Sequence, residues 1–500
     1  MQIPEHKMAK LFDCIQLFNQ TAYQQPHLVC NRVLSKKIFS GDYLDQYIKG
    51  ETLPTISFFF KVEKLVKYLL KNFIWLFEYL ANKIVWVFSK QTFPVTENEQ
   101  FVLIDSFFLG EKILKDQCFK DSYFPGLSEV LDLKKRPYIY CPKFSGCRKP
   151  WVLFEVLKIL QSHKIPTITE YQLVTVPDIL SLIHCLIMYP YNLLSAMKKL
   201  GNSSEEQFLK YALWSGFDEG ILSSYARHLY GMHLGEIFAQ NLKCISWCEN
   251  QETDKNFYSG LRCHNPKVLI YGAQLFVWPL TILNVHIDYT EIDFNLVPDV
   301  VVVNGPYYFE HSDLVTFRMG PSLRYTRLFK TEVAPVESKK IIVLLSYFDY
   351  EIRNILGYLK QWDYDFELVF RFHPATNMEK WTNLLPEKAK IDSGELYDSF
   401  QDCRIVIGAN TGSLIEAASL GIPVIVLRNF EQLNHNEMPE YGRGIIWDEA
   451  CNIAELNNLI IKYHTALENK SEKIISIGHE YKKLFFTKPT FECIIKAFDL

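Results

Sequence analysis

The order of apolar and polar positions divides the chain into a helical beginning and two alternating regions. Residues 1–95 contain no strong strand-like run and are predicted to be mainly helical. From residue 101 short apolar runs alternate with segments of helical spacing, and a second alternation begins near residue 341. Alternation of strands and helices is typical of parallel, doubly wound sheets with helices on both faces.

The apolar runs give the expected strands of the two regions. In the first region these are 101–108, 136–143, 244–249, 267–272 and 299–305, with a helix over 151–163. In the second region they are 341–349, 366–374, 404–410, 423–428 and 445–448, with helices over 351–362, 413–421, 451–470 and 471–484. A polar joint at 330–338 separates the two sets.

This pattern predicts an α/β protein with two Rossmann-like, doubly wound domains and a cleft between them. The expected parts are a helical N-terminal region at 1–95, a first domain at 96–330 and a second at 335–485. The tail at 486–500 is expected to cross back to the first domain. Doubly wound sheets bind ligands at the carboxyl ends of their strands, so the chemistry is expected where the two domains face each other.

Residues 56–88 are strongly apolar but carry a row of lysines. Lys61, Lys64, Lys67 and Lys71 recur every three or four positions, opposite Phe, Leu, Ile and Trp. With Glu78 and Lys83, they leave no window of roughly 20 uncharged residues that could span a bilayer. Two interpretations stay open: a helix lying in the headgroup region of an anionic leaflet, or an amphipathic helix packed on its own protein.

A second apolar stretch, 179–197, contains His184 and Pro190 and is expected to form a buried or interfacial hairpin. The first residues of the chain have no apolar signal-peptide core, so a cytoplasmic location is expected; the first of the two interpretations of 56–88 would place the protein peripherally on the inner face of the membrane.

Composition removes several classes of function. The 500 residues are 48% hydrophobic and 22% charged, as in an ordinary globular protein, and the net charge of −4 provides no general basic field for nucleic acid. The 12 cysteines form no Cys-x-x-Cys pair and have no pair of histidines nearby at zinc spacing. We therefore expect free thiols, no metal site and no nucleic-acid partner.

The sharpest local motif lies at 404–429, where a buried strand turns into a helix. Asn410, Thr411, Gly412 and Ser413 form a small polar turn there, and Glu416 follows one helical turn later. A helix start at the carboxyl edge of a sheet presents free N–H groups to a phosphate, and a carboxylate at Glu416 could accept bonds from sugar hydroxyls. The alternative is a simple helix cap at Thr411 or Ser413.

Arg371-Phe372-His373-Pro374 ends another strand of the same predicted sheet. Pro374 stops the strand, which exposes His373 at the carboxyl edge, where a histidine can donate to a phosphate or move a proton near neutral pH. Arg371 could pair with a phosphate or, as a structural element, with a carboxylate.

Glu249 follows a strand of the first predicted domain and is expected to face the cleft. A carboxylate there can take the proton of an attacking hydroxyl, so we predict Glu249 as a general base with His373 as its catalytic partner. The alternative is a carboxylate at the start of a helix that only complements the helix dipole: for Glu249 both interpretations stay open, and for Glu252 and Asp254 the helix start is the better explanation.

These motifs resemble a known family. Residues 366–448 look like the nucleotide-binding domain of GT-B transferases, in which this helix start binds the phosphates of a nucleotide. With the segments at 249–254, 272–275 and 298–305, the order resembles that of bacterial surface carbohydrate biosynthesis proteins over roughly 100–480. The chain departs from that pattern at Thr253, where the family has Trp, and at Leu275, where it has His.

The resemblance implies a metal-independent glycosyltransferase. Its substrate would be a nucleotide sugar, with no other cofactor, and its acceptor a surface polysaccharide or lipid-linked glycan, as in capsule or lipopolysaccharide synthesis. The phosphate-binding set would be Arg371, Asn410, Thr411, Gly412, Ser413 and Glu416. Two alternatives remain: a nucleotide-sugar 2-epimerase, and a degenerate transferase retained as an assembly or binding subunit.

Overall fold

The structure is a computed structural model of the chain. It describes residues 5–38, 43–89, 101–218, 220–238, 242–310, 312–332, 339–360, 366–374, 376–428, 438–469 and 472–500. Most of the predicted joint, 333–338, lies outside these residues.

The first sheet has six parallel strands in the order β2-β1-β3-β4-β5-β6. Their bounds are β1 Val102–Leu109, β2 Tyr138–Ser145, β3 Lys243–Trp247, β4 Leu269–Ala273, β5 Val300–Val303 and β6 Thr316–Met319. The first five are the predicted apolar runs. The sixth was missed because its sequence, Thr-Phe-Arg-Met, is half polar and lies at the edge of the sheet.

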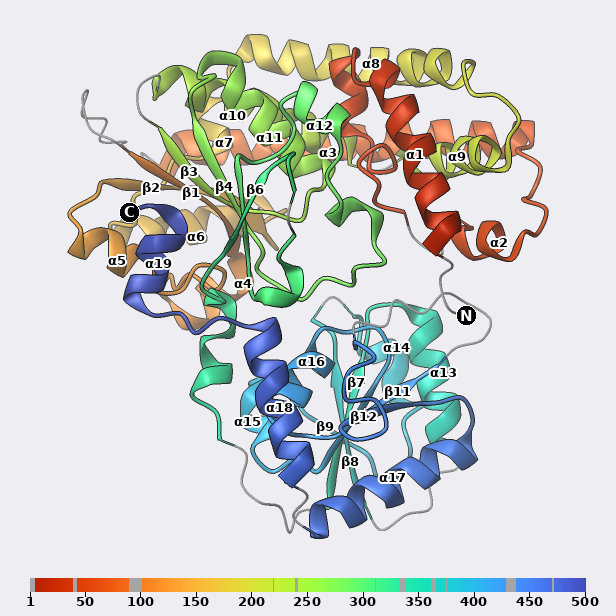
Figure 1. Cartoon of the computed structure of the whole chain (residues 1–500). Helices are drawn as coiled ribbons and strands as arrows, with labels where there is room; N and C mark the ends of the chain where they lie inside the picture. The colour runs from red at the N-terminus through yellow and green to blue at the C-terminus, as the bar shows by residue number, and fades with distance from the viewer. Residues whose placement is uncertain are drawn as a thin grey trace.

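The second sheet also has six parallel strands, in the order β12-β11-β10-β7-β8-β9. Their bounds are β7 Lys340–Leu345, β8 Glu367–Phe372, β9 Lys390–Ile391, β10 Ile405–Gly408, β11 Val424–Leu427 and β12 Trp447–Ala450. Figure 1 shows this sheet below the first, with helices around each. The predicted fold class, two Rossmann-like doubly wound domains, is therefore confirmed.

Helices cover both sheets. Those of the first domain are α4 Gly110–Asp116, α5 Leu127–Leu133, α6 Pro150–Ser162, α7 Glu170–Leu173, α8 Val176–Met197, α9 Ser204–Ser215, α10 Ile221–Ile237, α11 Glu252–His264 and α12 Tyr289–Asp293. Those that follow are α13 Asp349–Leu359, α14 Glu379–Thr382, α15 Leu396–Phe400, α16 Ser413–Ser419, α17 Ile453–Glu468, α18 Glu472–Phe485 and α19 Phe491–Phe498.

The N-terminal region is helical, with α1 Glu5–Ala22, α2 Leu44–Lys49 and α3 Phe58–Ser89. It shares one hydrophobic core with the first sheet, since Leu11 and Ile15 of α1 belong to the same cluster as Leu103 of β1. A buried ionic group joins the two parts as well. Lys36 pairs with Asp288 and Glu291 at 2.9 Å each, and Lys255 pairs with Glu291 at 2.5 Å.

The hairpin expected at 179–197 is wrong. The segment is part of one continuous helix, α8, which holds Pro190 in its interior. A capping box at Thr175 and Asp178 starts the helix, and a row of inward side chains anchors it: Leu182, Cys185, Leu186, Tyr189 and Leu193. Among the described residues α8 is the one helix long and apolar enough to cross a membrane, and a third of its apolar window is buried in the protein.

The C-terminal residues return to the first domain, where Figure 1 shows α19 beside the first sheet. The carboxylate of Asp499 accepts hydrogen bonds from Tyr271 of β4 at 2.6 Å and from Arg318 of β6 at 2.8 Å. Lys243 of β3 donates to the carbonyl of Phe498 at 2.9 Å.

The carboxyl edges of the two sheets face each other. Val277 lies just beyond β4 and Gly412 just beyond β10, and a Cβ atom added at Gly412 would lie 2.9 Å from the Cβ of Val277. The amide of Val277 donates to the Tyr325 hydroxyl at 2.9 Å. Val277 and Val303 belong to the same buried cluster as Leu414, so the domains share a core behind this edge.

Candidate active site

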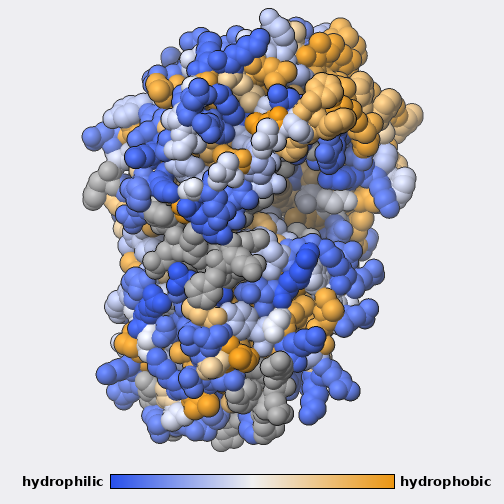
Figure 2. All heavy atoms as spheres, turned by 90° about the vertical axis from the view of Figure 1, so that its right-hand side faces the viewer, coloured by the Kyte–Doolittle hydropathy of each residue, from blue (hydrophilic) through white to orange (hydrophobic). Residues whose placement is uncertain are grey.

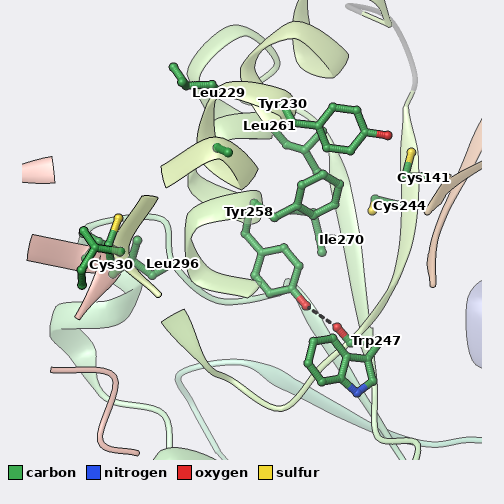
Figure 3. Packing of buried hydrophobic residues seen from close by; sticks show 14 of the residues in the cluster. Cys30, Cys141, Leu229, Tyr230, Cys244, Trp247, Tyr258, Leu261, Ile270 and Leu296 are labelled. Carbon is green, nitrogen blue, oxygen red and sulfur yellow. Dashed lines mark hydrogen bonds between the residues drawn. The ribbon is translucent and has the colours of Figure 1, made fainter. Parts of the chain in front are cut away.

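The first half of the site is the carboxyl end of β3. Tyr258 of α11 reaches back to this strand end, where its hydroxyl donates to the Trp247 carbonyl at 3.3 Å and contacts the Ser246 hydroxyl at 3.1 Å (Figure 3). Ser246 also donates to Asp105 of β1 at 2.8 Å. Hydrogen bonds from Tyr258 and to Asp105 therefore hold the end of β3 in place just before Glu249.

The turn that carries Glu249 is held by several hydrogen bonds. The amides of Glu249 and Gln251 both donate to one oxygen of Asp254, at 2.9 and 3.1 Å. Asn284 donates to the Glu249 carbonyl at 2.7 Å, and the Gln251 side chain donates to the Glu249 carboxylate. The Glu249 side chain is half-buried at this edge, which is the position predicted for it.

Burial and neighbouring charges shift the pKa of Glu249 toward neutral pH. Burial, followed by the charge of Asp254, raises the pKa of Glu249 to about 7, while Lys37, Lys143 and Arg324 act in the opposite direction. A carboxyl group with a pKa near 7 is partly ionised at neutral pH and binds a proton more firmly than an ordinary glutamate.

The structure places Asp254 at the start of a helix, as expected for a carboxylate with a structural role. Gln251 is the N-cap of α11, and Asp254, its third residue, completes a capping box. Glu252 is the first residue of the same helix, where a carboxylate complements the helix dipole.

The two departures from the family pattern fall on packed positions. Thr253 is 9% exposed, and the side chain of Leu275 is 1% exposed and lies in the core that the first sheet shares with the N-terminal helices. The leucine at 275 is therefore a core residue in this chain, and its apolar character suits that place.

The second half of the site is the carboxyl edge of the second sheet. His373 directly follows β8 and is exposed, as its place before Pro374 predicted, and its ring lies 5.2 Å from that of Tyr347. Partial burial, and then the charge of Arg324, lower the pKa of His373. The imidazole is therefore mainly neutral at physiological pH, with one nitrogen that donates and one that accepts.

Arg371 takes the structural alternative. Its guanidinium donates to Asp392 at 2.6 Å, to the Ser399 hydroxyl at 2.9 Å and to the Gly394 carbonyl at 2.7 Å. These bonds tie β8 to the segment after β9. The guanidinium is therefore engaged within the protein, as expected for the structural alternative.

The predicted phosphate turn sits at the facing edge, but its side chains are partly engaged. Asn410 donates to Glu351 of α13. The first helical bonds of the turn run from the amides of Leu414 and Ile415 to the carbonyls of Thr411 and Gly412. Within the residues that the structure describes, the amides of Gly412 and Ser413 have no hydrogen-bond acceptor, so both are available to an anion.

Glu416 is buried and bonded within the protein. Tyr397 of α15 donates to one of its oxygens, and Ser413 donates to the other at 3.1 Å. Burial raises the pKa of Glu416, with Tyr397, Arg324 and Ser413 opposing the rise. The predicted contact of this carboxylate with sugar hydroxyls would therefore be an additional bond on an acceptor that already has two donors.

Arg324, in the short helix η6 (Leu323–Phe329), is a residue that the sequence did not reveal. It is exposed, and its guanidinium lies 5.2 Å from the centre of the Tyr123 ring. Its charge acts on Glu249 of the first domain and on His373 and Glu416 of the second. In the part of the chain that the structure describes, its guanidinium forms no salt bridge, so no carboxylate there neutralises the cation.

Lys143 is a second such residue. It lies at the carboxyl end of β2, and its ammonium is 4.8 Å from the centre of the Phe107 ring and 5.4 Å from that of Trp247. Burial lowers the pKa of Lys143, and Arg227 adds to this. No sequence signal distinguishes Lys143 or Arg324 from other basic residues, because their significance comes only from the packing of distant elements. Among the described residues no cluster of three or more His, Cys, Asp or Glu side chains could hold a metal ion.

Comparison with known proteins yields only distant structural neighbours. No family model matches the sequence, and no curated protein does. The solved structures include HepE (Alr3699) of Anabaena in complex with UDP, with a TM-score of 0.41 and 10% identity over 80% of this chain and 97% of that one. MurG of Acinetobacter baumannii matches with a TM-score of 0.39 and 10% identity over 80% and 99%.

A UDP-GlcNAc 2-epimerase of Neisseria meningitidis bound to UDP-GlcNAc matches with a TM-score of 0.40 and 13% identity over 79% of this chain and 99% of that one. Similarity at this level does not assign a function to the chain.

Proposed function

We propose that this protein is a glycosyltransferase that uses a nucleotide sugar as donor. One observation carries the proposal: Glu249, whose pKa burial raises to about 7, lies at the carboxyl edge of the first sheet and faces the carboxyl edge of the second sheet, where the amides of Gly412 and Ser413 have no acceptor in the described residues. Transfer from a phosphate leaving group requires a base that takes the proton of the acceptor, and donors that stabilise the charge on the departing phosphate.

The residues support a direct displacement. A hydroxyl oxygen of the acceptor attacks the anomeric carbon of the sugar, and its proton passes to the carboxylate of Glu249. The bond from the anomeric carbon to the phosphate oxygen breaks, and the electron pair leaves with the nucleotide. Arg324 and the amides of Gly412 and Ser413 face the charge that develops on that oxygen, and His373 can donate to it.

We propose a polyhydroxylated acceptor of the surface-polysaccharide or glycolipid class, for use at the cytoplasmic face of a membrane. The supporting observation is the exposed apolar face of α3, in the N-terminal region that shares a core with the domain of Glu249.

The test is incubation of the full chain with a panel of nucleotide sugars, with and without glycan acceptors, followed by separate measurement of free nucleotide and of sugar isomerisation. Nucleotide release that depends on an acceptor supports a transferase. Isomerisation of the sugar without an acceptor would instead establish the 2-epimerase alternative. Binding of nucleotide without either reaction would establish a non-catalytic binding subunit.

A further inference from the structure

Helix α3 is packed with its polar side toward the protein. Its buried residues, Tyr68, Asn72, Leu76, Tyr79 and Asn82, recur every three or four positions and form a single face. This inward face makes specific hydrogen bonds: Tyr68 donates to the Leu186 carbonyl at 2.9 Å, and Asn72 accepts from the Leu222 amide at 3.2 Å. The helix does pack on its own protein, as one of the two open interpretations has it, but through this mixed polar and aromatic face.

Lys64 of the predicted polar row and Lys83, later in the helix, also reach the protein. Lys64 donates to the carbonyl of Ser215 at 2.6 Å, and Lys83 donates to that of Tyr171 at 2.9 Å. Lys61 lies 5.8 Å from the centre of the Trp214 ring. The ammonium groups of Lys64 and Lys83 are thus satisfied by carbonyl oxygens of the protein.

The opposite face of α3 is exposed and apolar from Phe58 to Phe77 and again from Ile84 to Phe88. Thirteen large apolar side chains of this helix are exposed: Phe58, Phe59, Val62, Leu65, Val66, Leu69, Leu70, Phe73, Ile74, Phe77, Ile84, Val87 and Phe88. Phe59 is 82% exposed and Phe77 is 71% exposed, values that core side chains do not show. Monomeric proteins rarely expose so many adjacent apolar side chains without a partner.

Helix α8 runs beside α3 in the antiparallel direction and adds a second stripe. Tyr68 contacts Leu186 and stacks on Tyr189, whereas Lys83, fifteen residues later in α3, reaches Val174 just before α8 begins. The exposed apolar residues of α8 again recur every three or four positions: Val176, Leu180, Ile183, Ile187, Tyr191 and Leu194. Figure 2, which faces the end where α3 begins, shows apolar side chains gathered at the upper right.

We propose that α3 and α8 dock the protein onto an anionic lipid leaflet, with the apolar face of α3 lying in the plane of the headgroup boundary. A helix of 32 residues is roughly 48 Å long, and the packing of its other side on the protein keeps it parallel to the surface. This binding surface stands independently of the proposed sugar transfer.

The charges beside the apolar face favour an anionic leaflet, and not a second copy of the chain, as its binding partner. Lys61, Lys67 and Lys71 are exposed on α3, and Lys198 and Lys199 are exposed just after α8. Glu63 is exposed there too and pairs with Lys67 at 2.5 Å. The border is therefore basic although the whole chain has a net charge of −4. Two copies paired through this face would bring equal basic borders together, whereas anionic headgroups complement them.

The experiment is flotation of the full chain with vesicles of phosphatidylcholine alone or mixed with phosphatidylglycerol. The test variant carries Leu70→Glu, Phe73→Glu and Phe77→Glu. The matched control carries Leu384→Glu, Ile461→Glu and Ile475→Glu, which are similarly exposed residues of the second domain. All six positions are exposed, so both variants should keep the wild-type circular dichroism and melting temperature.

We expect the wild type and the control to float with the mixed vesicles, and the α3 variant to lose binding about ten-fold or more. High salt should weaken binding to mixed vesicles. Failure of the wild type to float, or flotation of the α3 variant like the wild type, overturns the proposal.

Two further outcomes would overturn parts of it. Equal binding to neutral vesicles at all salt concentrations would remove the anionic preference. A wild-type dimer in sedimentation that the α3 variant converts to monomer, without flotation, would show that a second copy covers the face. Nucleotide binding in lipid-free solution should be the same in all three proteins, which separates this test from that of the transferase.

Discussion

At the scale of single residues, Glu249 combines a fixed backbone with a poised carboxyl group. We expect Glu249→Gln to lower turnover by about 10²–10⁴-fold with little change in donor affinity, because a base contributes mainly in the transition state. Steady-state kinetics with separate donor-binding measurements check this. Glu252→Gln is the control, and it should be mild because Glu252 only begins α11. Near-normal turnover of Glu249→Gln would remove Glu249 from catalysis.

Arg324 gives a second prediction, with a defined sign on pH. Since Arg324 lowers the pKa of Glu249, its removal should raise that pKa above about 7. The wild-type rate should fall as the pH drops through about 7 and the base becomes protonated, and in Arg324→Gln the same fall should occur at higher pH. Loss of the cation should also weaken donor binding about ten-fold or more.

The measurement for Arg324 is the pH profile of kcat/KM for the wild type and Arg324→Gln, with Arg327→Gln as control. Arg327 belongs to the same short helix but pairs with Glu395 and Asp398 on the surface. A profile of Arg324→Gln that coincides with that of the wild type would show that its charge does not reach Glu249 in the working enzyme.

The sequence predicted one of these two residues and not the other, for a physical reason. Glu249 directly follows an apolar run, so the strand's carboxyl end places it without knowledge of the rest of the fold. Arg324 lies in a short helix of mixed composition, and its position between the domains depends on how two sheets pack. Likewise, nothing local to Arg371 shows whether its partner will be a phosphate or Asp392.

At the scale of elements, Gly412 has a packing role that the sequence did not reveal. A Cβ there meets the Cβ of Val277 at 2.9 Å, so the glycine allows the two domains to approach each other. We expect Gly412→Ala to destabilise the protein by about 1–3 kcal/mol through overpacking, and to weaken nucleotide binding as the turn shifts. Denaturant unfolding and nucleotide titration measure the two effects.

Adding Val277→Gly to Gly412→Ala tests whether this contact causes the loss of stability, because it removes the Cβ of Val277 that the new Cβ would meet. The double variant should have a smaller loss than the sum of the two single variants. If the two losses simply add, the contact between these residues is not what makes glycine necessary at 412.

The elements also show where pattern reasoning works and where it fails. Buried central strands such as β5 (Val-Val-Val-Val) are unmistakable, whereas β6 and the two-residue β9 at the edges carry too little apolar sequence. For α3 the helical period of the pattern was correct, and the pattern left open which face meets the protein. Periodicity identifies two faces of a helix, but which face meets the protein depends on the hydrogen-bond partners that the neighbouring elements offer.

At the scale of the whole molecule, a buried ionic group holds the N-terminal helices to the first sheet domain. Lys36 lies after α1, while Glu291 and Asp288 belong to the α12 segment and Lys255 to α11; all four are nearly inaccessible. Lys36 and Lys255 are far apart in the sequence, so their shared contact with Glu291 connects distant segments of the chain. Removing one charge from it leaves others buried without compensation, which is costly.

We expect Glu291→Gln to lower the free energy of unfolding by about 3–5 kcal/mol, measured by denaturant titration. The control is Glu155→Gln, which breaks an exposed pair with Lys158 at 3.0 Å and should cost about 0–1 kcal/mol. The neighbouring lysines lower the pKa of Glu291 below its usual 4.5, against the effect of burial. The wild-type advantage should therefore be complete above pH 4.5 and shrink as the pH falls through the lower folded-state pKa. A loss in Glu291→Gln no larger than in the control, or independent of pH over this range, would show that the N-terminal helices are held by apolar packing alone.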